Sequence, residues 1–246
     1  MTEEEIEIHT AAGASEGFLY RPEARDRWPG VIHFTDIGGI RPAHQDMARR
    51  LAAQGYTVLV PNVFYRTGRL PVFDFPLKIG DERTMKRLAE LSAPLTAEAI
   101  GFDASDYVDF LARHDSVSPG GMGVVGYCFS GKMALYAAMS RGDRIVAAAS
   151  FHGGGLFTDT PTSPHLVLPV IAARLYFAHA TKDTSMPPEA IEKLDRALEA
   201  WGGQYESEVY DGAYHSWTVP DSPVYNQPQA ERAFEKLTKL FAETLK

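Results

Sequence analysis

The sequence predicts an α/β fold with a mostly parallel central sheet that is covered by helices on both faces. Short apolar segments rich in β-branched residues alternate with amphipathic segments along the 246 residues, a pattern typical of parallel strands buried between helices. The clearest case is residues 122–135, where an apolar run ends at Gly126 and an alanine-rich helical pattern soon follows. The length suits one α/β domain of ordinary size, so we expect a single domain over residues 1–246.

An antiparallel hairpin is expected first. Residues 4–9 and 16–20 alternate polar and apolar side chains on either side of Gly13, which is typical of two paired strands at a sheet edge. After the hairpin, short apolar runs predict buried strands, and a 3.6-residue apolar period with stops such as Gly55 predicts helices. The remaining strands are predicted at 30–35, 56–61, 122–125, 145–151, 175–179 and 205–210, and the helices at 42–54, 96–114, 187–201 and 229–245.

Residues 64–95 are less regular than the rest of the chain. They combine glycine, proline and phenylalanine with a short helical stretch at 81–91. Such a mixture suits a flap over a pocket, and a plain surface excursion is a nearly equal alternative.

Composition restricts the classes of partner. The formal net charge is −8 without a compensating basic stripe, which argues against nucleic acid and anionic membranes and favours small molecules. No apolar run approaches the length of a membrane span, and the acidic residues 1–5 do not resemble the basic front of a secretory signal. The single cysteine cannot form an intrachain disulfide. We therefore expect a cytoplasmic protein in a reducing compartment.

Cys128 is the candidate nucleophile. It follows a strand, has Gly126 two places before it and Ser130 two places after it, and precedes a helix. A sharp strand-to-helix turn needs small residues at those two places, and a helix start favours a thiolate. The alternatives are a buried hydrophobic cysteine, or Ser130 as the nucleophile, although Ser130 lacks a glycine two places before it.

A nucleophile at such a turn needs a base, and the base needs a carboxylate. In α/β hydrolases these residues come in the order nucleophile, acid, histidine, each after a strand. Asp183 and His215 fill that order, and no histidine spacing indicates a metal. Alternatively, Asp183 belongs to a solvated loop or helix start and His215 is an ordinary loop histidine. His33 and His179 suit core packing, whereas His152 is a possible pocket residue.

The oxyanion of an acyl-transfer intermediate needs two N–H donors. One usually comes from the residue after the nucleophile and the other from the loop after an early strand. Phe129 and Ile37 occupy those places. Gly38 and Gly39 would let the backbone approach a substrate, or simply serve the turn.

Taken together, these residues resemble the dienelactone hydrolases over nearly the whole chain. Residues 126–131 are similar to the family signature G-Y-C-x-G-G, with Ser130 in place of a glycine. The resemblance implies hydrolysis of a lactone or ester by a Cys-His-Asp triad, without a metal or organic cofactor. It also places Asp36 where the family has a glutamate that contacts the resting thiol. Asp36 is one methylene shorter, and it could instead cap its own loop.

The resemblance is incomplete at the substrate site. The family binds its substrate carboxylate with two arginines, and those positions are Met85 and Val219 here, with Arg83, Lys86 and Arg87 near the first. Aromatic residues in the loops suggest an apolar pocket instead. The residues expected to line it are Phe64, Tyr65, Trp217 and His152, with Phe73 and Phe75 nearby.

The sequence therefore predicts a cysteine hydrolase of small carboxylic esters or lactones, as a monomer or homodimer. A thioester intermediate favours reactive acyl groups, so a peptidase is a minor alternative. A non-catalytic ligand binder of the same fold and a redox switch at Cys128 are further alternatives.

Overall fold

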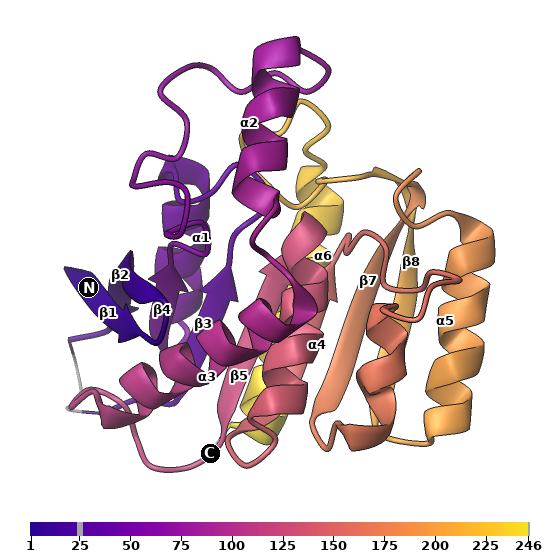
Figure 1. Cartoon of the computed structure of the whole chain (residues 1–246). Coiled ribbons are helices and arrows are strands. Elements are labelled where there is room, and N and C mark those ends of the chain that lie inside the picture. The colour runs from indigo at the N-terminus through magenta and orange to yellow at the C-terminus, as the bar shows by residue number, and fades with distance from the viewer. Residues whose placement is uncertain (24–26, 246) are drawn as a thin grey trace.

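One sheet of eight strands runs through the part of the chain that the structure, a computed structural model, describes, which is residues 1–23 and 27–245 (Figure 1). The strand order is β1-β2-β4-β3-β5-β6-β7-β8. The β1–β2 and β2–β4 pairs are antiparallel and all other pairs are parallel. The strands are β1 (Thr2–Thr10), β2 (Gly13–Arg21), β3 (Gly30–Phe34), β4 (Thr57–Pro61), β5 (Met122–Tyr127), β6 (Ile145–Phe151), β7 (Arg174–Lys182) and β8 (Tyr205–Tyr214). The predicted α/β class and edge hairpin are confirmed.

Helices cover both faces of this sheet. The α-helices are α1 (Pro42–Ala52), α2 (Glu82–Ser92), α3 (Ala97–Arg113), α4 (Gly131–Ser140), α5 (Pro188–Trp201) and α6 (Gln227–Thr244). Side chains of α3, α4 and α5 belong to one hydrophobic core, and side chains of α1 and α6 belong to a second core. The two cores lie on opposite faces because successive side chains of a strand point to opposite faces, as Val124 and Val125 of β5 do.

Strand β5 lies between β3 and β6, and all its residues are buried. Packing requires a glycine at position 123 of this strand, because a Cβ on Gly123 would lie 2.7 Å from Cε1 of Phe241 on α6. The missing side chain lets α6 approach the sheet. The strand that leads to the candidate nucleophile is thus held by two neighbouring strands and by helices above and below.

Local signals in the sequence set several helix ends. The side chains of Asp81 and Thr96 accept hydrogen bonds from the backbone N–H groups of Thr84 (3.2 Å) and Ala99 (3.1 Å) at the starts of α2 and α3. Helix α5 ends at Gly202, whose φ of 70° is in the left-handed region.

Two parts of the fold differ from the expectation. Strands β7 and β8 continue to Lys182 and Tyr214, which pair with each other after an irregularity in the register. Residues Pro164–Val170 form a short 3₁₀-helix that was not predicted, in a segment whose prolines disfavour an α-helix.

The segment 64–95 projects at the top of Figure 1 with helix α2. Its beginning packs on loops near β5, since the ring of Phe64 stacks on Phe129 with centroids 5.5 Å apart. Among the described residues, no helix is both long and apolar enough to span a membrane. The single-domain organisation and the role of this segment as a flap stay predictions.

Candidate active site

Cys128 stands at a sharp turn between strand β5 and helix α4. Its φ is 60°, in the left-handed region that non-glycine residues rarely adopt. A Cβ on Gly126 would lie 2.1 Å from the Ser130 carbonyl oxygen, and one on Gly131 would lie 2.3 Å from Ser150 Oγ. Glycine is required at the first place because the chain folds back on itself at the turn, and at the second because Ser150 of β6 lies directly against it. The strained turn presents the thiol at the carboxyl end of the sheet.

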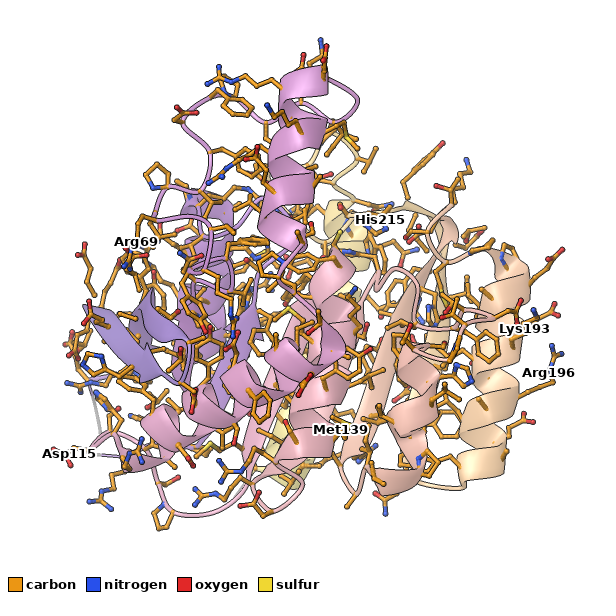
Figure 2. All side chains as sticks on the ribbon, in the orientation of Figure 1. Arg69, Asp115, Met139, Lys193, Arg196 and His215 are labelled. Carbon is orange, nitrogen blue, oxygen red and sulfur yellow. The ribbon has the colours of Figure 1, made fainter. Side chains whose placement is uncertain are left out.

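The structure brings Cys128, His215 and Asp183 together although they lie far apart in the sequence. The Nε2 atom of His215 is 3.0 Å from Cys128 Sγ. Its Nδ1 atom is 2.7 Å from Asp183 Oδ2. His215 follows β8 and Asp183 follows β7, and Figure 2 places His215 at the end of the molecule from which α2 projects. The arrangement gives the thiol a base and gives the base a carboxylate.

Electrostatics in this cluster favour a protonated imidazole. Burial lowers the pKa of His215, but its contacts with Asp183 and Cys128 outweigh burial and raise the pKa to about 10. Burial raises the pKa of Asp183, but hydrogen bonds from His215 and Ser185 outweigh burial and hold it below its usual value. Asp183 is therefore ionised at neutral pH, and His215 Nε2 is well suited to hold the proton of the thiol.

Ser185 is a site residue that the sequence did not reveal. Its Oγ donates to Asp183 Oδ1 (2.6 Å), its backbone N–H donates to the same oxygen (2.8 Å), and its Oγ lies 3.2 Å from His215 Nδ1. These contacts hold Asp183 Oδ1 in place, while Oδ2 of the same carboxylate faces the imidazole of His215. An aspartate in a loop commonly accepts a hydrogen bond from the residue two places after it. The spacing of Asp183 and Ser185 was therefore the one feature of the sequence that could have indicated this contact.

His152 is buried beside the nucleophile and contacts its backbone. The Nδ1 atom accepts a hydrogen bond from the Cys128 N–H (3.1 Å), so Nε2 carries the proton and donates it to Thr218 Oγ1 (2.8 Å). Burial, aided by His215, lowers the pKa of His152 to about 3. His152 thus stays neutral and holds the strained Cys128 backbone, a role that its sequence position did not indicate.

Two backbone amides occupy the positions expected of oxyanion donors. Among the turn, loop and side-chain hydrogen bonds of the described residues, none has the N–H of Ile37 or of Phe129 as its donor. Ile37 lies in the loop after β3, and Phe129 directly follows Cys128. Unpaired N–H groups at these two places are what an oxyanion requires.

Asp36 is engaged by residues other than the thiol. Its two oxygens accept from Arg41 at 2.6 and 2.9 Å, Oδ1 also accepts from the Gly38 N–H (2.8 Å), and Oδ2 is 3.2 Å from His44 Nε2. Burial raises the pKa of Asp36, but His44 and Arg41 outweigh burial and lower it. No contact between Asp36 and Cys128 occurs among the polar contacts of the described residues. The loop-capping alternative matches the bond to Gly38.

Ser130, the alternative nucleophile, is fully buried and already bonded. Its Oγ accepts from the Tyr127 N–H (2.8 Å) and lies 3.1 Å from the Phe34 carbonyl oxygen. It therefore ties the end of β3 to the turn at Cys128. A hydroxyl in this position cannot reach a substrate.

The four residues expected to line a substrate pocket are all buried: Phe64, Tyr65, His152 and Trp217. Tyr65 lies elsewhere than expected, because its Oη donates to Asp103 Oδ1 (2.7 Å) and accepts from Thr10 Oγ1 (2.8 Å). Trp217 packs edge-on to His152 with ring centroids 5.1 Å apart, and this contact helps to hold the imidazole of His152 in place. The Phe64 ring stacks on Phe129, the residue that follows the candidate nucleophile.

The remaining candidate residues are placed as follows. Val219 is fully buried, Met85 is exposed, and Arg83 pairs with Asp74 (3.1 Å). His33 and His179 are buried in the core, where His33 Nε2 lies 2.9 Å from His44 Nδ1 and His179 stacks on Phe177. Among the described residues, no group of three or more His, Cys, Asp or Glu side chains is arranged to hold a metal ion.

Comparison with known proteins places this geometry in a family. A sequence model of the dienelactone hydrolase family matches residues 15–245. A carboxymethylenebutenolidase of Rhodococcus opacus is 27% identical over 198 residues, which cover 78% of this chain and 73% of that protein.

Solved structures of low sequence identity show the same fold. One from Klebsiella pneumoniae, described as "Putative Dienelactone Hydrolase", has a TM-score of 0.86 at 22% identity and covers 98% of each chain. A dienelactone hydrolase-like promiscuous phosphotriesterase from metagenomic libraries has a TM-score of 0.80 at 19% identity, over 100% of this chain and 99% of that chain.

Proposed function

Because this chain belongs to the dienelactone hydrolase family and is a hydrolase of lactones or esters, we propose that it cleaves small carboxylic esters or lactones through a thioester on Cys128. The observation that carries the proposal is the contact of Cys128 Sγ with His215 Nε2 at 3.0 Å, backed by Asp183 at 2.7 Å. A nucleophile, a base and an orienting carboxylate in hydrogen-bond contact form the minimal apparatus for acyl transfer.

Acylation begins with the thiol. With its proton already held on His215 Nε2, Cys128 Sγ attacks the carbonyl carbon as a thiolate. The oxyanion that forms accepts hydrogen bonds from the N–H groups of Ile37 and Phe129, neither of which is a donor in the turn and loop hydrogen bonds of the described residues. As the C–O bond breaks, His215 gives its proton to the leaving alkoxide, and the acyl group remains on sulfur as a thioester.

Deacylation uses the same residues, with His215 acting first as a base toward water. Water loses a proton to His215 Nε2 and attacks the thioester carbonyl through its oxygen. The second oxyanion collapses, the C–S bond breaks, and the carboxylic acid leaves, which restores the thiolate beside the protonated His215. Asp183 keeps Nδ1 of the imidazole protonated throughout, so that Nε2 is the atom that exchanges protons.

The proposed substrate is a small neutral or weakly polar ester or lactone. Val219 and Met85 supply no cation where the family binds a substrate carboxylate, and Arg83 is already paired with Asp74. An alkoxide or enolate leaving group suits a thiolate, because an amine would favour return of the thiol from the intermediate. The enzyme is proposed to act as a monomer or homodimer in the cytoplasm, without a cofactor.

The test is pre-steady-state kinetics with a chromogenic short-chain ester. Wild type is expected to release a burst of chromophore of about one equivalent before steady turnover, because the thioester hydrolyses more slowly than it forms. Cys128→Ala and His215→Ala should each lose both burst and turnover, while His9→Gln, at an exposed histidine, should behave as wild type. Turnover of Cys128→Ala at the wild-type rate would contradict the proposal.

A further inference from the structure

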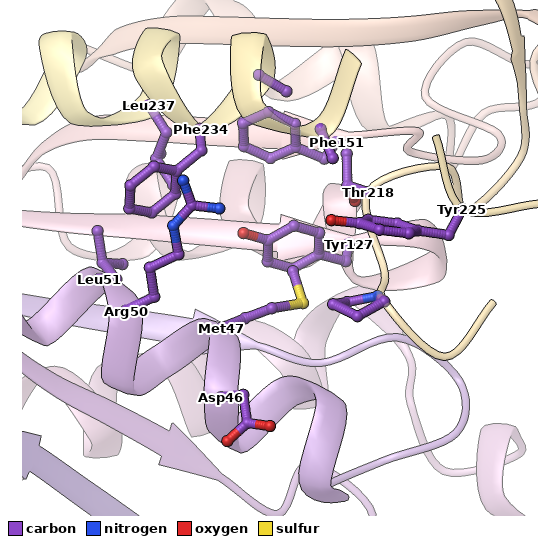
Figure 3. Close-up of a pocket in the computed structure, with 13 residues that line it drawn as sticks. Asp46, Met47, Arg50, Leu51, Tyr127, Phe151, Thr218, Tyr225, Phe234 and Leu237 are labelled. Carbon is purple, nitrogen blue, oxygen red and sulfur yellow. The ribbon is translucent and has the colours of Figure 1, made fainter. Parts of the chain in front are cut away.

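A cavity lies on the opposite side of the sheet from helices α3 to α5. It has a volume of about 130 Å³ and opens between α1 and α6 (Figure 3). Its wall includes Met47, Arg50, Tyr127, Phe151, Tyr225 and Phe234. Cys128, His215 and Asp183 are not among its lining residues. The cavity is therefore separate from the candidate active site, although Tyr127 directly precedes the nucleophile.

One hydroxyl group in the wall, that of Tyr127, faces the cavity without a hydrogen-bond partner among the described residues. Tyr127 is 5% exposed, and Figure 3 shows its hydroxyl directed into the space beside Arg50 and Phe234. In the part of the chain that the structure describes, the hydrogen bonds of Tyr127 are made by its backbone N–H and carbonyl oxygen and not by Oη. Burial keeps the pKa of Tyr127 far above its usual value, so the group is a neutral phenol. A hydroxyl that faces a cavity without a protein partner is available to bond a ligand or a water molecule.

Other polar groups in the wall narrow the kind of ligand. The Tyr225 hydroxyl also enters the cavity near Thr218 in Figure 3, and Thr218 Oγ1 is already bonded to His152. A ligand hydroxyl can both donate and accept, so it can pair with either tyrosine.

Charge in the wall argues for a neutral ligand. Arg50 Nη1 donates to Glu231 Oε1 (2.8 Å), and its guanidinium lies 3.8 Å from the Phe234 ring centroid. Asp46, at the rim, accepts from Arg49 (2.6 Å). Both charged lining groups are thus neutralised by neighbours, and neither is free to attract an ion.

We propose that this cavity binds a small neutral aromatic molecule with one hydroxyl group, for which phenol is the simplest example. Four lining residues, Tyr127, Phe151, Tyr225 and Phe234, present aromatic rings, and Met47 adds a thioether that packs well against a ring. The size also fits, because an apolar protein cavity of about 150 Å³ holds one benzene molecule. The ring would pack among these side chains while its hydroxyl bonds Tyr127. The inference is independent of the proposed reaction.

The experiment is a calorimetric titration of the full chain with phenol, with toluene as a ligand of similar shape that lacks the hydroxyl. Wild type is expected to bind one phenol with a dissociation constant on the order of 1 mM, and toluene about fivefold more weakly because it leaves Tyr127 unpaired. Protein alkylated at Cys128 should bind phenol as wild type does. No phenol binding at ten times that concentration, or loss of binding after alkylation, would overturn the inference.

Variants locate the site. Ala233→Phe on α6 fills the cavity and should abolish phenol binding, whereas Ala242→Phe, exposed on the same helix, should leave it unchanged. Tyr127→Phe keeps the shape of the wall and should bind phenol about fivefold more weakly, with toluene unaffected or improved. Because Tyr127→Phe adds no atoms, it keeps the inference testable if Ala233→Phe does not fold. Equal phenol affinity of wild type and Tyr127→Phe would disprove the role of the hydroxyl.

Discussion

Arg41 holds Asp36 with two hydrogen bonds, Nη1 to Oδ1 at 2.6 Å and Nη2 to Oδ2 at 2.9 Å. The same guanidinium donates to both oxygens of Asp221, at 2.7 and 2.9 Å. Asp36 precedes Ile37, whose amide is a candidate oxyanion donor, and Asp221 lies in the segment that follows His215. One arginine therefore joins the loop after β3 to the segment after β8.

Arg41→Gln is expected to lower the free energy of unfolding by about 2 to 3 kcal/mol, because it leaves the buried carboxylate of Asp36 without its cation. It should also lower kcat, because the loop that carries the Ile37 amide loses its support. Denaturant unfolding and ester turnover measure the two effects. Arg49→Gln removes an arginine that also has two carboxylate partners but is more exposed than Arg41 (36% against 27% of the side chain), and it is the matched control, with an expected cost below about 1 kcal/mol. Equal effects of both substitutions would contradict the bridging role.

His152→Leu should lower kcat about tenfold or more, because the Cys128 N–H loses its acceptor and the left-handed turn loses support. His152→Asn, which can place an oxygen near the position of Nδ1, should retain more activity. Since the pKa of His152 is about 3, neither substitution should move the ionisations seen in the pH profile of kcat/KM between about pH 5 and 9. A shift of that profile would show that His152 exchanges protons in the reaction.

Stability should depend on pH through His215. The pKa in the folded protein is about 10, above the ordinary value of 6.5. The contribution of His215 to stability is therefore fully present below pH 6.5 and is lost as the pH rises through 10. The difference in unfolding free energy between wild type and His215→Gln should shrink over this interval. A difference that stays constant or grows would show that His215 is not stabilised as the cation.

Ser130→Ala should destabilise the protein by about 1 to 3 kcal/mol, because the buried Tyr127 N–H loses its acceptor. The acylation burst should persist, since the proposed nucleophile is Cys128. Ser140→Ala removes a helix-surface serine that bonds the Tyr136 carbonyl (2.8 Å), and it should cost less than about 1 kcal/mol. Loss of the burst in a folded Ser130→Ala protein would return Ser130 to consideration as the nucleophile.

Most of the strands and helices could be predicted from the sequence, because their apolar residues recur with strong periodicity. The strand at Ile145–Phe151 and the order of Cys128, Asp183 and His215 could be found from local residue types and their positions after strands. These patterns arise from burial of one face of each element, which local sequence records.

The rest depended on tertiary contacts. Nothing near Tyr65 indicates that its hydroxyl would bond Asp103 on α3, and nothing near His152 indicates that it would accept from the Cys128 N–H. Asp36 shows the same limit, because its partner Arg41 is close in sequence while Asp221, the other partner of that arginine, is 180 residues from Arg41. Aromatic residues in loops are especially hard to place, since they fill either a pocket or the core.

Cys128 and His215 are held by strands that differ in their resistance to local unfolding. Cys128 is anchored to β5, between β3 and β6, whereas His215 is anchored to β8, which has a neighbour on one side only. Edge strands fray at lower free energy than strands inside a sheet, and their amide protons exchange with solvent sooner. Fraying of β8 would carry the imidazole away from a thiol that stays in place. On mild heating, activity should therefore be lost before the protein unfolds. The inactive molecules would still be folded, but their Cys128 would lack its base.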